Sequence, residues 1–295
     1  MSSRRAHGVR RYLLLLIAAG TALYAATPAL LRRAFRVGKG RSNELPSDVI
    51  WIQGRRGKRL AARYLVPPGV DPLGVALVMH GWGSSSERML AAVEPLHGAG
   101  LSVLLIDARC HGASDDDDLT SMPRFAEDIE SGLEWLGDHQ GIDPRRVILI
   151  GHSVGAGAAL LAATRIQVAG VVTLSSMAHP RDMMKSSMAR ARIPRAIVAY
   201  VMWRMQRILG QRFDEFAPVN TIRRVSSPVL IVHGDSDVAV PLSDAYRLQQ
   251  SARQGTRVLV IQGADHRAPD AFVREAGEIT SWITSLWSDA DVYLT

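Results

Sequence analysis

The sequence predicts an α/β protein with a mostly parallel sheet, helices on both faces and a helical cap, preceded by a transmembrane helix. Three observations carry this prediction. Short apolar runs alternate with helix-like stretches, chemically active residues follow several of these runs, and an uncharged stretch of twenty residues lies near the amino terminus. The chain has 295 residues, 47% of them hydrophobic, so it is long enough to bury a core. With Cys110 as its single cysteine, it forms no intrachain disulfide.

Positive charge is concentrated in two short segments. The net charge is +7, from 35 basic and 28 acidic residues. Residues 1–41 contain nine basic residues and no acidic one, and residues 177–212 contain eight basic residues and one acidic residue. The rest of the chain is therefore acidic, and no broad basic face is left to follow a phosphate backbone. Nucleic acid is not an expected partner.

The amino terminus has the pattern of a membrane segment. We divide it into a basic tail over residues 1–11, a transmembrane helix or signal anchor over residues 12–31, and a linker over residues 32–47. Residues 12–31 hold no charge, and about twenty apolar residues span a bilayer core. Arginine pairs flank the stretch on both sides, as they do at headgroup layers. The alternatives are a cleaved secretory signal and a helix packed on the following domain.

These features predict a single-pass membrane protein. Four arginines precede the helix and five basic residues follow it closely, so the charge bias leaves the orientation ambiguous. The short tail in front favours a cytoplasmic amino terminus, which would make the rest of the chain extracytoplasmic.

Strand-like and helix-like stretches then alternate over residues 48–290, which predicts a doubly wound sheet. The segments Val49–Gln53 and Leu60–Val66 are typical of an early hairpin. Wholly apolar runs typical of buried parallel strands follow at Val75–Met79, Ser102–Ile106, Arg146–Ile150, Gly170–Leu174, Pro228–Val232 and Arg257–Ile261. Helix-like stretches lie at Met89–Ala99, Phe125–His139, Gly155–Thr164, Ser243–Gln250 and Ala271–Leu286. Such sheets bind ligands at the carboxyl ends of their strands, where functional residues are therefore expected.

The first candidate site follows the run that ends at Ile150. The segment Gly151–Gly155 reads Gly-His-Ser-Val-Gly and leads into a helix of small residues. This is a Gly-x-Ser-x-Gly pattern on a strand-to-helix turn, in which side chains at the glycine positions would collide with neighbouring backbone. The turn exposes Ser153 at its tip, so Ser153 is the candidate nucleophile.

A second loop can supply donors to the oxyanion that such a nucleophile creates. The strand ending at Met79 is followed by His80, Gly81 and Trp82. An oxyanion needs two preorganised N–H donors, and we expect them to be the backbone amides of Trp82 and Val154. His80 is expected to be a structural residue under the loop.

The remaining partners follow two later strands. A carboxylate beyond a strand end can orient an imidazole, and both Asp235 and Asp237 qualify. His266 lies on a loop after the last strand and is the candidate general base, while Asp265 is expected to be a solvated neighbour.

With these motifs in this order, the chain resembles the α/β-hydrolase superfamily of serine hydrolases. It is most similar to the branch of bacterial esterases, lipases and serine aminopeptidase-like proteins. The resemblance covers Val49–Trp287 and includes the order Ser, acid, His. The family pattern His-Gly-x-x-Asp-x-x-Val-Pro matches His233–Pro241, which assigns the acid to Asp237 rather than Asp235. The resemblance implies an α/β-hydrolase fold over residues 48–290.

Another segment resembles the family pattern Asp-x-Arg-Gly-His-Gly-x-Ser. It runs from Asp107 to Ser114, with Cys110 in place of the usual glycine, so this turn is expected to differ locally. Asp107 and His111 are expected to be structural.

The fold also implies a cap insertion, which we place at about residues 177–216. This segment holds six of the ten methionines, interspersed with arginines. Methionine-rich surfaces adapt to irregular apolar ligands, and basic helices with an apolar face lie on anionic membranes. The alternative is a cap that packs its apolar face on the body of the protein. The acidic run Asp115–Asp118 is expected to be a solvated loop without a metal.

The sequence thus predicts a membrane-anchored serine hydrolase that cleaves an ester or related acyl bond through Ser153, His266 and Asp237 and an acyl-enzyme. It needs no cofactor. The expected partners are a small acyl substrate, with a lipid as one candidate, and a membrane that the chain contacts through the amino-terminal helix, with the basic cap as a second candidate contact. Peptide or amide hydrolysis and acyl transfer are alternative activities. A non-catalytic binding module with this fold is a further alternative, although a scaffold would not require the three residues.

Overall fold

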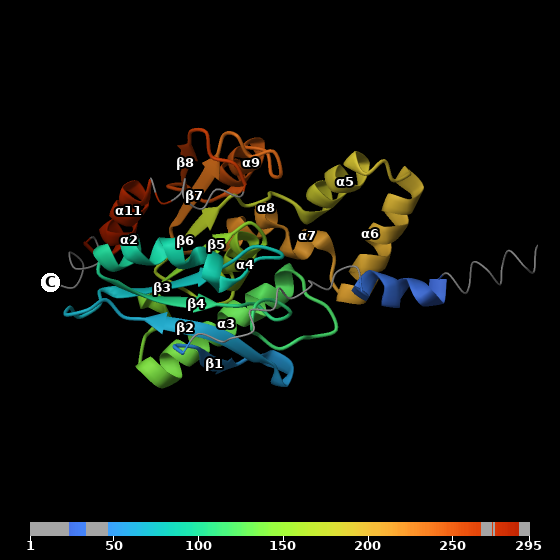
Figure 1. Cartoon of the computed structure of the whole chain (residues 1–295). Helices are drawn as coiled ribbons and strands as arrows, with labels where there is room; N and C mark the ends of the chain where they lie inside the picture. Colours follow the sequence, from blue (N-terminus) through green and yellow to red (C-terminus); the bar gives the residue numbers. More distant parts are fainter. Residues whose placement is uncertain (1–23, 34–46, 267–272, 274, 289–295) are drawn as a thin grey trace, which may run out of the picture.

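An eight-stranded sheet forms the centre of the structure (Figure 1). This computed structural model describes residues 24–33, 47–266, 273 and 275–288. The strands follow the order β1-β2-β4-β3-β5-β6-β7-β8 across the sheet. Their bounds are β1 (Ile50–Gln53), β2 (Arg59–Leu65), β3 (Gly74–Met79), β4 (Leu101–Ile106), β5 (Val147–His152), β6 (Gly170–Leu174), β7 (Val229–Gly234) and β8 (Arg257–Ile261).

The strand pairing confirms the mostly parallel sheet. β1 pairs antiparallel with β2, and β2 pairs antiparallel with β4. The pairs β4–β3, β3–β5, β5–β6, β6–β7 and β7–β8 are all parallel. All eight expected strands are present, and their ends differ from the expected ones by no more than two residues.

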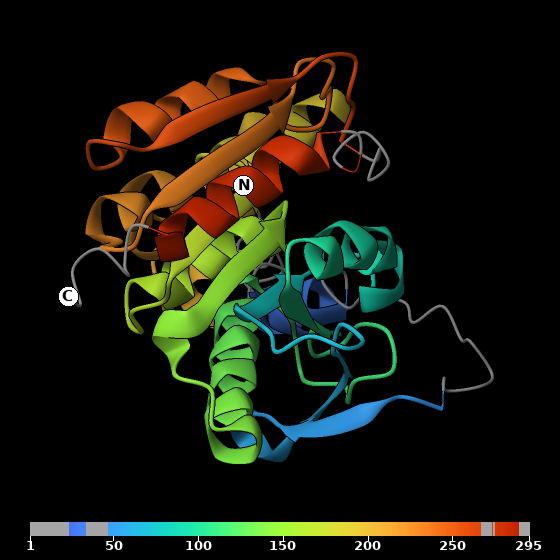
Figure 2. The ribbon, with the colours of Figure 1, turned by 90° about the vertical axis from the view of Figure 1, so that its left-hand side faces the viewer.

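Helices cover both faces of the strongly twisted sheet (Figure 2). One face carries α3, α4, α8 and α9, and the other carries η2, α2 and α11. The bounds of the helical segments are η1 (Arg55–Gly57), η2 (Ser86–Ala92), α2 (Val93–Gly98), α3 (Met122–Gln140), η3 (Pro144–Arg146), α4 (Val154–Ala163), α5 (Pro180–Arg190), α6 (Arg195–Leu209), α7 (Phe213–Phe216), α8 (Pro218–Thr221), η4 (Ile222–Arg224), α9 (Ser243–Ser251) and α11 (Ala276–Ser288). The single helix expected over residues 89–99 is divided into η2 and α2.

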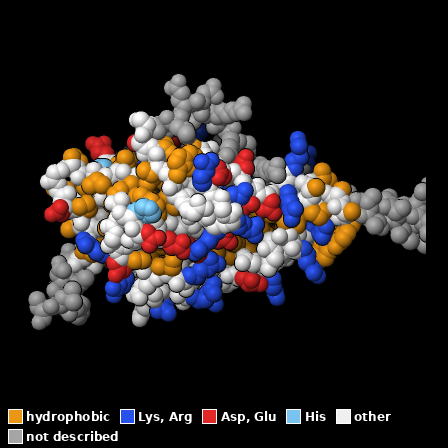
Figure 3. All heavy atoms as spheres, turned by 90° about the horizontal axis from the view of Figure 1, so that it is seen from below, with side chains coloured by type: hydrophobic (Ala, Val, Ile, Leu, Met, Phe, Trp, Pro, Cys, Tyr) orange, Lys and Arg blue, Asp and Glu red, His pale blue; other side chains and the backbone are white. Residues whose placement is uncertain are grey.

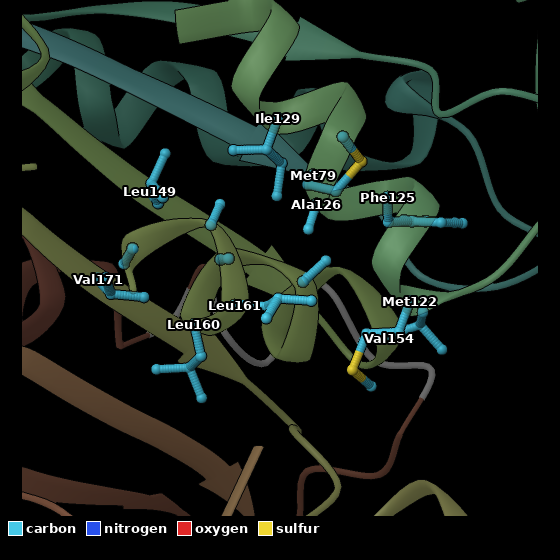
Figure 4. Close-up of a cluster of buried hydrophobic side chains, with 14 of the residues drawn as sticks. Met79, Met122, Phe125, Ala126, Ile129, Leu149, Val154, Leu160, Leu161 and Val171 are labelled. Atoms are coloured by element: carbon cyan, nitrogen blue, oxygen red, sulfur yellow. The ribbon is translucent and has the colours of Figure 1, made fainter. Parts of the chain in front are cut away.

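Alternate side chains of each central strand enter different cores. Leu77 and Leu149 belong to the core beneath α3 and α4, whereas Val78 and Ile150 belong to the core beneath α2 and α11. Figure 4 shows side chains of α3 and α4 in the first of these cores, including Ile129 on α3 and Leu160 on α4. Because both faces are covered, every residue of β3 is buried, which explains the wholly apolar runs in the sequence.

The insertion between β6 and β7 contains α5, α6 and α7, and α5 and α6 project from one side of the body (Figure 1). Met202 and Met205 on α6 are buried and join the core that also contains α4. These two methionines therefore belong to a continuous apolar core.

The predicted single-pass membrane location is wrong for the part of the chain that the structure describes. None of the helices in residues 24–33, 47–266 and 275–288 is both long enough and apolar enough to cross a membrane. Residues 1–23, which include the basic tail and most of the predicted span, and residues 34–46 of the linker lie outside the described residues.

Residues 24–33 are helical and pack against α6, and they comprise the described end of the predicted span (residues 24–31) and the first two residues of the predicted linker. The Tyr200 hydroxyl donates to Thr27 Oγ1 at 3.1 Å, and an Arg204 Nη donates to the carbonyl oxygen of Tyr24 at 3.0 Å. The Arg204 guanidinium also lies 4.1 Å from the centroid of the Tyr24 ring. In residues 24–33, side chains and backbone that could contact lipid instead contact α6. The composition of the sequence alone does not distinguish between these two environments.

Acidic and basic side chains are interspersed on the face drawn in Figure 3. Much of the acidic run after β4 is paired. Asp115 lies 3.2 Å from an Arg59 nitrogen, and Asp117 lies 3.3 Å from an Arg109 nitrogen. Within the described residues, no group of three or more His, Cys, Asp or Glu side chains is arranged to hold a metal ion.

Candidate active site

Ser153 occupies a sharp turn between β5 and α4. Its backbone angles, φ of 54° and ψ of −113°, lie in a region that residues other than glycine rarely adopt. Such strain is found at functional turns. The flanking glycines permit the turn because a Cβ at Gly155 would lie 2.4 Å from the carbonyl oxygen of His80. A Cβ at Gly151 would lie 2.3 Å from the carbonyl oxygen of Gly155. The collision expected from the Gly-x-Ser-x-Gly pattern is therefore observed.

A chain of hydrogen bonds joins the three residues expected at this edge of the sheet. Ser153 Oγ lies 3.1 Å from His266 Nε2, and His266 Nδ1 lies 2.8 Å from Asp237 Oδ2. A carboxylate accepts hydrogen bonds only, so Nδ1 carries the proton and Nε2 is free to accept from the Ser153 hydroxyl. Ser153 follows β5, Asp237 follows β7 and His266 follows β8. Parallel strands thus bring His266 together with residues 29 and 113 positions away in the sequence at one edge of the sheet.

The two candidate acids have different partners. Asp237 Oδ1 accepts the backbone N–H groups of Ala239 and Val240 at 2.9 and 2.8 Å, while Oδ2 faces His266. Burial alone would raise the pKa of Asp237, but the hydrogen bonds from His266 and Val240 outweigh it and lower this pKa below its usual value. Asp235 instead accepts the Gly263 N–H at 2.8 Å, so it ties together the turns after β7 and β8.

The loop after β3 lies directly against Ser153. We call residues 81–85 the oxyanion loop. A Cβ at Gly81 would lie 3.3 Å from Ser153 Cβ, which shows how closely this backbone approaches the hydroxyl. Trp82 follows Gly81, and Val154 follows Ser153 at the start of α4, so both residues expected to supply backbone donors lie beside Ser153.

His152 belongs to the site although the sequence did not single it out. Its Nε2–H donates to the carbonyl oxygen of His266 at 3.1 Å, and the two rings lie 5.1 Å apart. Burial, followed by repulsion from His266, lowers the pKa of His152 to about 4, so its imidazole is neutral at pH 7. The one available signal was its place inside the Gly-x-Ser-x-Gly pattern.

A cavity of about 530 Å³ opens beside Ser153, between the η2–α2 segment and α11. Its walls are mostly apolar and include Met89, Leu96, Leu174 and Ile279, with Arg88 as their charged member among the described residues. No residue of the insertion over residues 177–216 is among the described residues that line it. The sequence missed this cavity because it depends on how two helices separate above the sheet.

The sequence model of the alpha/beta hydrolase family matches residues 75–276, which is more than half of the chain. The chain belongs to the alpha/beta hydrolase family.

Two relatives from other organisms illustrate the sequence similarity. An uncharacterized protein of Mycobacterium tuberculosis is 31% identical over 232 residues, covering 78% of this chain and 76% of that protein. The human alpha/beta hydrolase domain-containing protein 17C is 24% identical over 157 residues, covering 53% of this chain and 42% of that protein.

Solved structures show the same fold at lower identity. An esterase of Pyrococcus furiosus is 20% identical with a TM-score of 0.64, covering 83% of this chain and 95% of that chain. A monoacylglycerol lipase of Paleococcus ferrophilus is 22% identical with a TM-score of 0.55, covering 77% of this chain and 99% of that chain. At these identities the similarity concerns the fold.

In this alpha/beta hydrolase, Cys110 adopts the backbone conformation that glycine would favour, with φ of 65°. Its buried Sγ accepts the N–H of Asp117 at 3.2 Å. The preceding residue, Arg109, is fully buried, and its Nη2 lies 2.6 Å from Asp128 Oδ1 on α3. The turn therefore keeps a left-handed backbone conformation at the position where the family pattern has glycine. The Cys110 thiol also holds the loop that follows through its hydrogen bond with Asp117.

Proposed function

We propose that this alpha/beta hydrolase is a serine hydrolase that cleaves carboxylic esters with an apolar acyl group. The observation that carries the proposal is the hydrogen-bonded chain from Ser153 through His266 to Asp237, with distances of 3.1 and 2.8 Å. This arrangement can deprotonate a hydroxyl, hold the resulting imidazolium and return the proton to a leaving group. Two solved structures with this fold are named as an esterase and a monoacylglycerol lipase, and both names denote ester hydrolysis, which supports the proposal.

In the proposed reaction, Ser153 Oγ attacks the acyl carbon and its proton passes to His266 Nε2. Asp237 stabilises the charged imidazole through Nδ1–H. The backbone N–H groups of Trp82 and Val154 donate to the oxygen that becomes negative in the tetrahedral intermediate. His266 then protonates the departing alcohol. A water molecule repeats the attack on the acyl-enzyme and releases the acid.

The apolar cavity supports an acyl chain longer than acetyl. Cavities of a few hundred cubic ångströms with apolar walls and few polar groups are typical of small-molecule sites. Each buried methylene contributes about 0.8 kcal/mol, which corresponds to about fourfold in kcat/KM. We therefore expect kcat/KM for p-nitrophenyl esters to rise about fourfold per methylene from acetate onward, until the chain fills the cavity.

The test is labelling of the folded protein by a fluorophosphonate, combined with hydrolysis of this ester series. Wild-type protein should be labelled at Ser153, and Ser153→Ala should be unlabelled and slower by about 10⁶ in kcat. Ser186→Ala, an exposed position on α5, is the matched control and should behave as wild type. Absence of labelling in wild-type protein, or more than a few per cent of activity in Ser153→Ala, would refute the proposal.

A further inference from the structure

The oxyanion loop is held from the side by a second loop that the proposed reaction does not use. We call Asp107–Ser114 the clamp loop. It follows β4, whereas the oxyanion loop follows β3, and these two strands are parallel neighbours. A side chain of the clamp loop accepts a backbone N–H of the oxyanion loop, and His80, which precedes the oxyanion loop, accepts a backbone N–H of the clamp loop.

His111 makes the contact nearest to Trp82. The Gly83 N–H donates to His111 Nε2 at 3.1 Å, and His111 Nδ1–H donates to the carbonyl oxygen of Arg109 at 3.0 Å. His111 is 1% exposed. Because Nε2 accepts from an amide, the ring must be neutral, with its proton on Nδ1.

His80 makes the reciprocal contact. Its Nε2 accepts the Ala108 N–H at 3.0 Å, and its Nδ1–H donates to the carbonyl oxygen of Gly81 at 2.7 Å. Burial, followed by repulsion from His111, lowers the pKa of His80 to about 4. This histidine is therefore also neutral at pH 7, in the same tautomer as His111.

Asp107 holds Ser86, the residue that follows the oxyanion loop. Its Oδ1 accepts the Ser86 N–H at 2.7 Å, and its Oδ2 accepts the Ala113 N–H at 2.9 Å. Side chains of the clamp loop thus contact the backbone at Gly83 and Ser86. The Gly81 carbonyl is held by His80, which also accepts the N–H of Ala108 in the clamp loop.

The oxyanion loop is partly exposed at Trp82 and Gly83. Trp82 is 38% exposed, and its ring meets the edge of the His111 ring with centroids 5.9 Å apart. His111 also packs against His80 and Phe125, with centroid separations of 5.0 and 5.1 Å. One side of Trp82 therefore rests on a ring that is itself fixed in the core.

We infer that His111 is a positioning residue that, together with His80, holds the backbone of Trp82 on both sides. His80 holds the Gly81 carbonyl, which belongs to the peptide that carries the Trp82 N–H, and His111 holds the Gly83 N–H of the next peptide. This inference rests on the proposed function, because it concerns the oxyanion of that reaction. A backbone donor stabilises a developing charge only when it is preorganised. Loss of the Gly83 bond leaves Trp82 held on one side only and so loosens the donor, without altering Ser153, His266 or Asp237.

Kinetics of two His111 variants test this inference. His111→Phe retains the ring but loses both hydrogen bonds, and we expect kcat to fall about 10- to 100-fold, somewhat less than for complete removal of an oxyanion donor. KM for a neutral p-nitrophenyl ester should stay within about twofold. His111→Gln keeps an acceptor for Gly83 and should recover most of kcat. His139→Phe, on the exposed end of α3, is the matched control and should leave both constants unchanged.

Inhibition separates positioning from a general structural effect. A trifluoromethyl ketone adds to the serine and places an oxyanion among the same donors, so its Ki should rise in His111→Phe by the factor by which kcat falls. Ki of an aliphatic alcohol with the same chain, which places no negative oxygen among these donors, should not change. A folded His111→Phe protein with wild-type kcat, or an equal loss in the Phe and Gln variants, would overturn the inference.

A measurement on wild-type protein covers the case in which His111→Phe does not fold. The ¹⁵N shifts of the His111 ring should report the neutral form with the proton on Nδ1, and the opposite tautomer would overturn the inference. If wild-type protein instead shows neither labelling nor ester hydrolysis, the proposed function fails whatever the tautomer of His111.

Discussion

The two faces of the sheet are covered by helices in different ways. On one face, α3 packs so closely on the sheet that a Cβ at Gly132 would lie 2.4 Å from Ile106 Cδ1. There α4 also packs so closely on α3 that a Cβ at Gly157 would lie 2.6 Å from Met122 Cε. On the other face, η2, α2 and α11 leave the cavity of about 530 Å³ beside Ser153. Both faces bury apolar strand residues, but the first is closely packed and the second has room for a ligand.

This difference suggests a division of work in the molecule. Substitutions in the closely packed face should act on the free energy of unfolding, because interiors at native density neither expand nor collapse without cost. Substitutions around the cavity should act mainly on the choice of substrate. The four predictions below test this division.

The largest effect is expected at the edge of the sheet where the candidate residues meet. Asp237→Asn should lower kcat about 10⁴-fold, because an amide favours the wrong tautomer of His266. Asp235→Asn should have only a small effect on kcat. Thermal unfolding should show that both variants remain folded. The opposite ranking of the two variants would transfer the acid role to Asp235.

Truncation of a large side chain should distinguish the two faces. Phe125 on α3 is fully buried, and Phe125→Ala should lower the free energy of unfolding by about 3–5 kcal/mol. Met89→Ala on the cavity wall should cost less than half as much, because its neighbours already border open space. Urea unfolding measures both. Equal losses would mean that the cavity wall contributes as much to stability as the closely packed face.

Acid should destabilise the protein through the buried histidines. The pKa of His152 in the folded protein is about 4, below its ordinary value of 6.5, so only the unfolded chain gains this proton as the pH falls through that window. Stability is retained above pH 6.5 and falls below it, by about 1.4 kcal/mol per pH unit for such a group. The difference between wild type and His152→Gln isolates this contribution from those of other groups. Urea unfolding at pH 7.5, 6 and 5 should give a shallower slope for the variant, whereas His139→Gln should keep the wild-type slope.

Enlarging an alanine should have opposite consequences on the two faces. Ala92 lines the cavity, and Ala92→Phe should reduce kcat/KM for an octanoate ester about 10-fold relative to acetate, with little change in stability. Ala158 on α4 is fully buried, and Ala158→Phe should lower stability by about 1–3 kcal/mol through overpacking. Ester assays and urea unfolding of both variants provide the comparison. An Ala92→Phe protein with unchanged chain-length preference would show that the acyl group lies elsewhere.

Features that depend on local patterns were accessible from the sequence. Six strands were predicted from apolar runs, such as β3, in which every residue is buried, and β1 and β2 were predicted as a hairpin. Ser153 and His266 follow from their places after strand ends, whereas the choice of Asp237 over Asp235 came from the resemblance to the family pattern. Their hydrogen bonds are present in the structure, while their catalytic roles remain predictions. The cavity, the contact of His152 with His266 and the clamp loop depend on distances between separate segments. The single-pass location was wrong for the described residues, and for residues 24–31 the reason is similar, because hydropathy does not reveal that α6 packs against them.

The contact between residues 24–33 and α6 limits how far the chain can be shortened. Thr27 and the Tyr24 carbonyl are held by Tyr200 and Arg204, and the Tyr24 ring lies 6.3 Å from that of Trp203. A chain that begins at Ser47 would lose these partners and leave the rings of Tyr200 and Trp203 as a wider apolar patch. Such patches promote self-association. The short helix thus acts as a cover for α6, and expression without it should favour aggregates even though every candidate catalytic residue is retained.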